Sequence, residues 1–209
     1  MKKNWFVVIL SALALLFDIL FHCTVIKFHL IVFLDTIFVV SLTIYAGLVP
    51  GLIVSAVHNP IITLLFCSLT KTQVSYYDFM YSICGMLIVT VTWAFSHNKK
   101  EFLFSRTVTV LYLFVIALCS SFVSCISASL LDTFVRPFFS QTLQLSVVDD
   151  FYSVFQHFNF GIFFSYLLPR IPITVLDRLI CTFAGYGVYK LIKLIEPYIL
   201  HSSSTVQEG

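Results

Sequence analysis

Residues 33–66 decide the fold, and they read FLDTIFVVSLTIYAGLVPGLIVSAVHNPIITLLF. Most of this stretch is as apolar as lipid, which predicts two membrane-spanning helices. It is interrupted by six polar or helix-breaking residues, which are Asp35, Pro50, Gly51, His58, Asn59 and Pro60. A central carboxylate costs a membrane helix roughly 2.5 to 3.5 kcal/mol on insertion scales, so polar residues there usually have a purpose. We therefore place the candidate functional site in this stretch.

The composition of the whole chain is that of an integral membrane protein. Of its 209 residues, 59% are hydrophobic and 11% are charged, and the mean hydropathy is +0.99. Soluble domains of this size do not have such a composition. The fold class that follows is an all-α bundle of about six transmembrane helices. The predicted spans cover residues 5–22, 34–48, 51–69, 78–97, 105–131 and 171–195.

Four features of the spans carry further expectations. The second span is short, so we expect thinned bilayer around it or neighbouring helices that shield it. The segment from Gly47 to Gly51 contains helix-ending residues and predicts a tight hairpin between the second and third spans. Residues 150–168 are aromatic but partly polar, which predicts an interfacial or re-entrant helix. The last span is expected to open after Pro169, with Pro172 in its first turn.

The distribution of Lys and Arg predicts the orientation of the bundle. Seven of these residues fall on one side and about four on the other when the amino terminus is placed inside. The positive-inside rule then predicts a multi-pass protein of the cell membrane with both termini in the cytoplasm. We expect a retained first helix instead of a cleaved signal peptide, because no small-residue cleavage site follows it. Residues 1–200 form one membrane domain, and residues 201–209, HSSSTVQEG, are expected to be a disordered tail.

Four polar residues of the opening stretch are candidates for substrate binding. Asp35 and Thr36 stand at a predicted helix start, where they either cap the helix or contact a polar ligand. His58 and Asn59 precede Pro60, whose missing backbone amide can open a kink towards a cavity. For this pair a role in a ligand site or gate competes with simple hydrogen bonding between helices.

Other polar and aromatic residues admit a structural and a functional interpretation. Asp18 and His22 are four residues apart and are expected to pair on one helix face. Asp177 and Arg178 are adjacent in the last span, so each needs a partner on another helix or water, in a structural or coupling role. Four aromatic residues fit either an interfacial belt or a stack on a planar ligand, and they are Trp93, Tyr76, Tyr77 and Tyr81. Of these, Tyr77 and Tyr81 are candidate substrate contacts.

No chemical motif points to catalysis, a cofactor or a metal. The nucleotide-binding pattern GxxxxGK[ST] and the hydrolase patterns HExxH and GxSxG do not occur. The six cysteines form no CxxC and no zinc spacing with histidine, so we interpret them as small buried hydrophobic residues. A net charge of +2 without a basic aromatic run argues against nucleic acid as a partner. We expect no catalytic residues, no metal and no cofactor.

The pattern resembles the substrate-binding S components of energy-coupling factor (ECF) vitamin transporters. The resemblance rests on Leu34-Asp35-Thr36-Ile37 at a helix start, the turn at residues 47–51, Asn59 in the next helix and the run LDRLI at 176–180. It covers residues 33–66 and 170–195 best, and the middle of the chain matches in hydropathy alone. Many S components carry AxxxA on the first helix, whereas Ser11, Ala12 and Ala14 provide small residues at another spacing.

The resemblance implies a non-catalytic uptake subunit. Such a subunit has six helices, captures a vitamin or similar micronutrient from outside, and docks onto a transmembrane coupling subunit driven by separate ATPase subunits. The partners implied are therefore the micronutrient, the coupling and ATPase subunits, and the lipid bilayer. One alternative is a membrane sensor or assembly protein without transport activity. Another is an intramembrane enzyme, which would need Asp18, His22, His58, Asp177 and Arg178 to meet in space.

Overall fold

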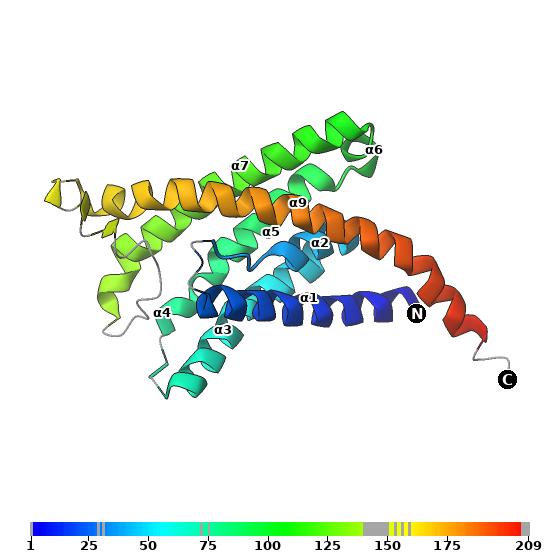
Figure 1. Ribbon diagram of the computed structural model, residues 1–209, viewed down its shortest axis with the longest axis horizontal. Helices are drawn as coiled ribbons and strands as arrows, with labels where there is room; N and C mark the ends of the chain where they lie inside the picture. The colour runs from blue at the N-terminus through cyan, green and yellow to red at the C-terminus, as the bar shows by residue number, and fades with distance from the viewer. Residues whose placement is uncertain are drawn as a thin grey trace.

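The chain folds into an elongated bundle of helices (Figure 1). The computed structural model describes residues 2–28, 30, 32–71, 73–74, 76–139, 151–152, 154–155, 157–158 and 160–205. The main helices are α1 (Lys2–Lys27), α2 (Ile37–Ala46), α3 (Leu48–Thr70), α5 (Ser82–Ser96), α7 (Arg106–Leu130) and α9 (Ile162–Thr205). Shorter helical pieces are α4 (Tyr76–Phe79), α6 (Lys99–Phe102), η1 (Leu131–Val135) and η2 (Arg136–Phe138). Because the described residues form helices and no strand, the predicted all-α class is confirmed.

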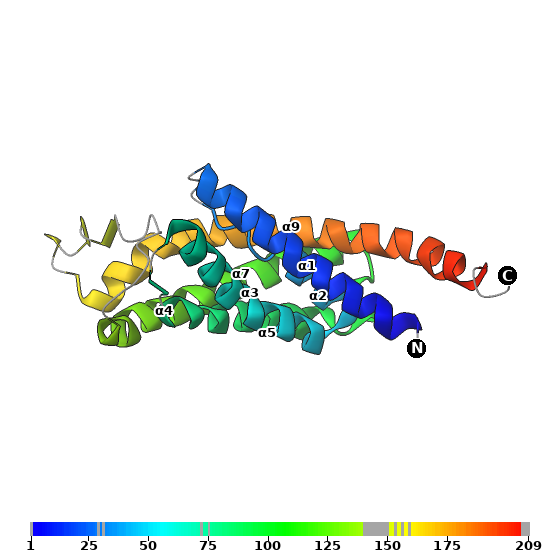
Figure 2. The ribbon, with the colours of Figure 1, turned by 90° about the horizontal axis from the view of Figure 1, so that it is seen from below.

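Five of the helical segments are long and apolar enough to cross a membrane. They are Asn4–Lys27, Leu48–Thr70, Tyr76–Ser96, Arg106–Phe138 and Ile162–Pro197. Each overlaps one predicted span, and the remaining predicted span corresponds to α2. Figures 1 and 2 show the start of α1 and the end of α9 at the same end of the bundle, as six passes require. The chain is therefore a membrane protein, and its orientation stays a prediction.

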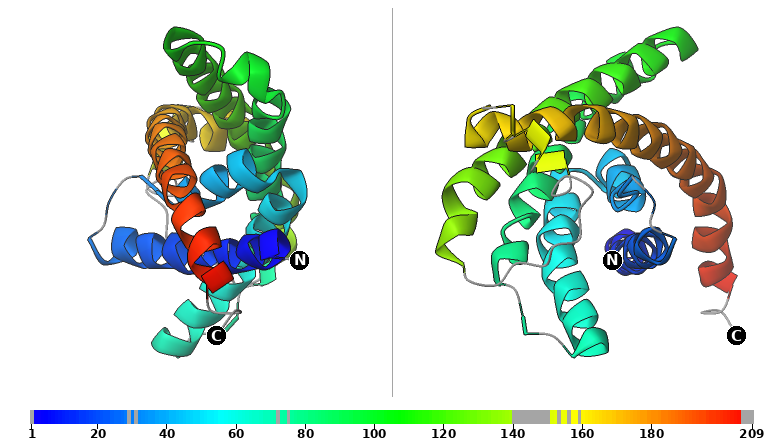
Figure 3. Two further views of the ribbon diagram at one scale, coloured as in Figure 1. Left: turned by 90° about the vertical axis from the view of Figure 1, so that its right-hand side faces the viewer. Right: turned by 60° about the vertical axis from the view of Figure 1, so that its left-hand side comes forward.

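The short helix α2 lies inside the bundle. Seven of its ten residues are buried, and α1, α3, α5 and α9 pack around it (Figure 3). At 1.5 Å per residue α2 is only about 15 Å long, half of the hydrocarbon thickness. Of the two alternatives expected for this short span, thinned bilayer or shielding by neighbours, the helices around it provide the shielding.

The tight connection between α2 and α3 forms at a single glycine. Helix α2 ends at Ala46, α3 begins at Leu48, and Gly47 between them has φ 96° and ψ −167°. This backbone region is open almost only to glycine, because a Cβ atom clashes there. Pro50 then lies in the first turn of α3, where its missing amide costs no helix hydrogen bond. The predicted hairpin turn is confirmed.

A second glycine sets the distance between α2 and α9. A Cβ atom added to Gly185 would lie 2.7 Å from the carbonyl oxygen of Ile37 and 2.9 Å from Cγ1 of Val40. Two helices approach this closely only where one of them has no side chain. Gly187, two positions further along α9, is exposed and has open space around it.

Lys99 closes the bundle at the end away from the start of α2. Its Nζ donates to the carbonyl oxygens of Ile44 at 2.6 Å and Ser96 at 2.7 Å, which are among the free carbonyls at the ends of α2 and α5. The ammonium also lies over the rings of Phe102 and Tyr189. Burial, with a smaller contribution from Lys193, lowers the pKa of Lys99 to about 8.

The prediction for the start of the last span was wrong. Helix α9 begins at Ile162 and contains Pro169, Pro172 and Pro197. Each internal proline removes one backbone hydrogen bond, and membrane helices tolerate this loss where neighbouring groups replace it. The rule that places proline at a helix start therefore put the start of this span, residue 171, nine residues after the start of the helix.

Two predictions fall partly outside the described residues. Of the expected interfacial segment 150–168, residues 162–168 belong to the first two turns of α9, and residues 150, 153, 156 and 159 are not described. Of the expected tail 201–209, helix α9 includes residues 201–205. The remaining residues, 206–209, lie outside the described part.

Candidate functional site

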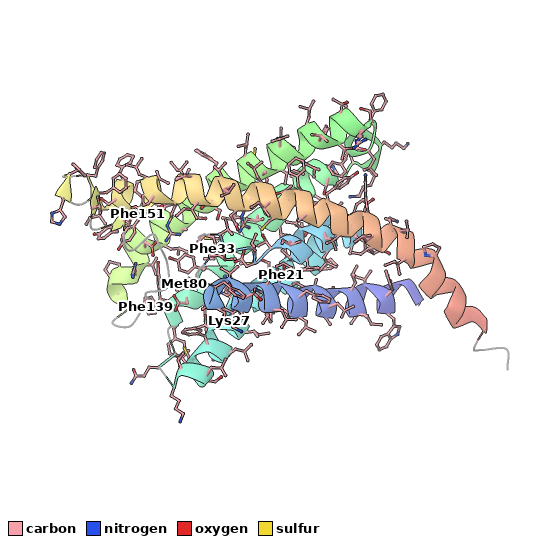
Figure 4. All side chains as sticks on the ribbon, in the orientation of Figure 1. Phe21, Lys27, Phe33, Met80, Phe139 and Phe151 are labelled. Atoms are coloured by element: carbon pink, nitrogen blue, oxygen red, sulfur yellow. The ribbon has the colours of Figure 1, made fainter. Side chains whose placement is uncertain are left out.

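A cavity of about 370 Å³ lies among the helices. It is at the end of the bundle where α1, α3 and α7 finish and where α2, α5 and α9 begin. Every one of these six helices contributes lining residues. Phe33, which lines the cavity, lies between α1 and α9 in Figure 4. The volume is within the range of small-molecule sites in proteins, at its lower end.

The cavity exists because α2 starts deep in the bundle. Asp18 on α1 accepts hydrogen bonds from the backbone amides of Phe38 at 3.0 Å and Val39 at 2.9 Å, in the first turn of α2. Asp18 lies nine residues before Lys27, the last residue of α1, so α2 begins about 14 Å below the end of α1. The segment from Phe33 to Thr36 fills part of this depth without helical structure. Irregular backbone at such depth is tolerated only where protein or a cavity surrounds it.

Four charged residues, Asp18, Asp35, Asp177 and Arg178, hold this segment and are called the deep cluster below. Asp177 Oδ1 accepts hydrogen bonds from the backbone amides of Phe33 and Leu34, both at 2.8 Å. Arg178 contacts Asp177 directly. Its Nη2 also lies 3.1 Å from Asp35 Oδ1. These contacts join the middle of α9 to the segment that precedes α2.

Thr36 and Asp35 bind Arg178 instead of capping α2. Thr36 is the residue before the first turn, but its side chain makes no capping hydrogen bond and its Oγ1 accepts from Arg178 Nη1 at 2.6 Å. Arg178 Nη2 and Asp35 Oδ1 form an ion pair at 3.1 Å, and the side chain of Asp35 is 20% exposed.

Two histidines lie beside Asp35. The rings of His22 and His58 pack edge to face with centroids 5.8 Å apart, and both line the cavity. His22 Nδ1 lies 4.0 Å from Asp35 Oδ2, which is beyond hydrogen-bond distance. His22 Nδ1 and His58 Nε2 are buried and have no hydrogen-bond partner among the described residues. Buried polar atoms normally find a partner, so these nitrogens indicate a place for a ligand or water.

Asn59 lines the cavity beside a break in the hydrogen bonds of α3. Pro60 has no backbone amide to offer the carbonyl of Ala56, and the hydroxyl of Ser82 on α5 donates to that carbonyl at 3.1 Å instead. A neighbouring helix thus replaces the bond that proline removes. The predicted opening of polar residues towards a cavity at Pro60 agrees with the positions of His58 and Asn59.

A second cluster of polar residues lies nearer the end of the bundle and is called the rim cluster below. It consists of Tyr77, Tyr81, Asp132 and Arg170. Asp132 Oδ1 accepts hydrogen bonds from the hydroxyls of Tyr77 at 2.5 Å and Tyr81 at 2.7 Å, and Asp132 Oδ2 contacts Arg170. Asp132 belongs to the π-helical segment η1, a local widening that often occurs at functional sites. Arg170 and Arg178 are eight residues apart on α9, so about 12 Å separates the two clusters along this helix.

The structure brings the predicted substrate contacts together. All six line the cavity, and they are Asp35, Thr36, His58, Asn59, Tyr77 and Tyr81. Their binding of a substrate stays a prediction. Arg178 also lines the cavity, and Asp177 lies behind it.

Several structural interpretations need correction. The predicted pair of Asp18 and His22 is not formed, because Asp18 turns to α2 and His22 turns to Asp35 and His58. Asp177 and Arg178 were expected not to face each other, but their side chains touch.

The interfacial belt does not describe all of the aromatic residues. Tyr77 is 2% exposed, and both Tyr77 and Tyr81 bind Asp132 in the rim cluster. Tyr76 is 66% exposed, so an interfacial position suits it. Trp93 stacks on His97 with ring centroids 5.1 Å apart.

Sequence reasoning missed the rim cluster because its charged members stand at the edges of apolar runs. Asp132 follows the predicted span 105–131, and Arg170 precedes the predicted span 171–195, so both were assigned to loops. Tyr77 and Tyr81, one helical turn apart, were the available signal. Together with these tyrosines, the carboxylate of Asp132 and the guanidinium of Arg170, at the same end of neighbouring spans, would have indicated the cluster.

Removing the carboxylate of Asp18 is expected to destabilise the start of α2. In Asp18→Ala the amides of Phe38 and Val39 lose their acceptor in a buried site, which typically costs about 1 to 3 kcal/mol per orphaned group. Thermal unfolding in detergent should show a lower Tm than the parent protein. An unchanged Tm would mean that water replaces the carboxylate and that α2 does not depend on α1 for its cap.

The chemistry of the lining does not favour a metal. Among the described residues no group of three or more His, Cys, Asp or Glu side chains is arranged to hold a metal ion. Four of the five residues that an intramembrane enzyme would need do line the cavity; these are Asp18, His22, His58 and Arg178. The carboxylates of Asp18 and Asp177, however, are each bound to two backbone amides. These two carboxylates therefore hold the backbone and are not placed as proton acceptors.

Comparison with models of protein families, with curated proteins and with solved structures finds no match to this chain.

Proposed function

We propose that the chain is the substrate-binding membrane subunit of an ECF-type importer for a vitamin or similar micronutrient. The observation that carries the proposal is a cavity of about 370 Å³ around the non-helical segment that precedes α2. A bundle built only to span lipid has no need of irregular backbone at this depth, whereas a binding site uses it to present amides and side chains. The role is binding and not catalysis.

The segments that resemble S components meet at this cavity. Asp35 and Thr36 from the first segment bind Arg178 from the LDRLI run, and Asn59 lines the same space. Since the chain carries no nucleotide-binding motif, the energy for uptake would come from separate ATPase subunits through a coupling subunit. The proposed orientation, with both termini in the cytoplasm, would open the cavity towards the outside.

A sensor or assembly protein is the second candidate, and one observation favours it. The carboxylates of Asp18 and Asp177 accept hydrogen bonds from backbone amides. The carboxylate of Asp132 accepts hydrogen bonds from two tyrosines and pairs with Arg170. Such contacts fix helix packing whether or not a ligand binds. The two candidates differ in whether the cavity has a specific occupant.

The first test is mass spectrometry of small molecules released from protein purified in mild detergent, with a washed sample beside it. We expect one compound in about stoichiometric amount that the wash does not remove. Copurification with an ECF coupling module in the same membranes would support the importer. An empty, folded protein that never associates with such a module would contradict the proposal and favour the sensor.

Asn59→Ala provides the matched test in cells, with Asn98→Ala as the control. Asn59 lines the cavity, whereas Asn98 is exposed near α6 and makes no capping hydrogen bond through its side chain. Losing one hydrogen bond to the substrate should weaken binding on the order of tenfold. Uptake of the released compound should fall in Asn59→Ala at unchanged protein level and stay at the parent rate in Asn98→Ala. Equal uptake by both variants would show that Asn59 does not contact the substrate.

A further inference from the structure

Carboxylates outnumber guanidinium groups around the cavity. Among the described residues that line it or contact its arginines there are five aspartates, Asp18, Asp35, Asp78, Asp132 and Asp177. The arginines that line the cavity are three, Arg136, Arg170 and Arg178. No lysine lines the cavity among these residues. Near the rim Asp132 lies between Arg170 and Arg136, whereas Asp35 and Asp177 share the one guanidinium of Arg178. Charge without compensation is costly inside a membrane bundle, so the group around Arg178 calls for a positive counterpart.

The surplus lies in the deep cluster. Two carboxylates, those of Asp35 and Asp177, contact the single guanidinium of Arg178 there. Asp18 and Asp177 are 1% and 0% exposed and are bound by backbone amides. Asp35 has the most exposed side chain of the three carboxylates, and it lines the cavity. Its Oδ1 accepts a hydrogen bond from Arg178 Nη2 at 3.1 Å. Its Oδ2 accepts no hydrogen bond from any of the described residues. Oδ2 is thus the acceptor that the deep cluster offers to the cavity.

Two further acceptors stand beside Asp35 Oδ2. A neutral imidazole carries one nitrogen that accepts a hydrogen bond. His58 is only 7% exposed, and neither its Nε2 nor His22 Nδ1 has a hydrogen-bond partner in the part of the chain that the structure describes. The two rings touch each other next to Asp35. An anion would meet a carboxylate here, whereas a positively charged nitrogen finds three acceptors.

We propose that the cavity binds a small organic cation whose charged nitrogen lies between Asp35 Oδ2, His22 and His58. This inference rests on the proposed function of the cavity as a solute site and names the class of its substrate. The rest of the lining suits an organic frame, because Phe33, Phe66 and Ile62 supply apolar surface. The charged nitrogen of the cation would supply the positive counterpart that Asp35 Oδ2 calls for.

The test compares probes that share a frame and differ in charge. One set is 1-methylnicotinamide, nicotinamide and nicotinate, which are a cation, a neutral molecule and an anion; the second is choline and its uncharged analogue 3,3-dimethylbutan-1-ol. The measurements are thermal shift and calorimetric titration of the full chain in detergent at pH 8. We expect at least one cation to raise Tm and to bind on the order of tenfold or more tighter than its neutral analogue. No shift with either cation, or an equal shift with a neutral or anionic probe, would overturn the inference.

Two variants assign the charge preference to the deep cluster. Asp35→Asn keeps the shape and removes the charge, so the preference for the cation should disappear, whereas the exposed Glu101→Gln on α6 should keep it. If Asp35→Asn does not fold, His58→Lys serves instead, because it puts a fixed cation among the carboxylates. His58→Lys should fold and lose cation binding. Parent-like cation binding in a folded variant of either kind would refute the assignment.

The outcomes separate this inference from the importer proposal. If the protein binds cations but never associates with a coupling module, the cation inference is supported and the importer proposal is contradicted. If the protein takes up a neutral or anionic compound and the cations do not inhibit this uptake, the importer proposal is supported and the cation inference is contradicted.

Discussion

Asp177→Ala is expected to give the largest loss of stability of any single change at the site. The carboxylate is fully buried, accepts the amides of Phe33 and Leu34 and contacts Arg178. Its removal leaves two backbone donors without a partner and weakens the pairing of a buried guanidinium. Breaking a buried ion pair from one side typically costs about 3 to 5 kcal/mol.

The measurement is the unfolding of purified variants in mixed micelles, followed by fluorescence. Asp177→Asn is the graded comparison, because its amide oxygen still accepts one hydrogen bond and its shape is unchanged. We expect the order parent, Asp177→Asn, Asp177→Ala in falling stability. Equal stability of the alanine variant and the parent would show that the segment from Phe33 to Thr36 is held by other contacts.

Gly185→Ala is expected to disrupt the packing of α2 on α9, and Gly187→Ala is expected not to. A methyl group at 185 meets the carbonyl oxygen of Ile37 at 2.7 Å, and a backbone atom cannot rotate away. Forcing extra atoms into a packed interface typically costs about 1 to 3 kcal/mol. A methyl group at 187 meets nothing within 4 Å. Because alanine favours helix over glycine by roughly 1 kcal/mol, Gly187→Ala should be neutral or slightly more stable.

The pair of glycine variants also tests the link from packing to binding. Pushing the start of α2 away from α9 moves Thr36 and Asp35 from Arg178. Tm and affinity for the bound compound should therefore fall together in Gly185→Ala and stay at parent values in Gly187→Ala. A loss of stability of the same size in both variants would mean that α9 is sensitive to any added side chain, and not to its contact with α2.

The sequence predicted the helices well, because apolar runs of sufficient length have few alternatives inside a membrane. Gly47 and Pro50 also located the turn between α2 and α3, since few residues adopt the backbone required there. The start of α9 was placed too late, because proline rules taken from helix ends ignore how a bundle replaces lost hydrogen bonds.

The polar residues at the site were predicted as individuals, and their partners were not. Asp35 was singled out by its position, but only the fold shows that Arg178, 143 residues later, binds it. Asp18 was paired with His22 by helical spacing, yet it caps a different helix. Which carboxylate meets which donor depends on how helices pack, and one sequence does not contain that information.

The two ends of α2 are held by groups that the ribosome makes much later. Lys99 closes its last turn, and Asp177 fixes the segment before its first turn. While the chain is being synthesised, residues 33–50 therefore enter the translocon without these partners. Asp18 on α1 is made earlier and can already hold the first turn of α2, but the segment before that turn gains its contacts with Asp177 only once α9 has been inserted. The lining of the cavity is therefore completed only with the last helix.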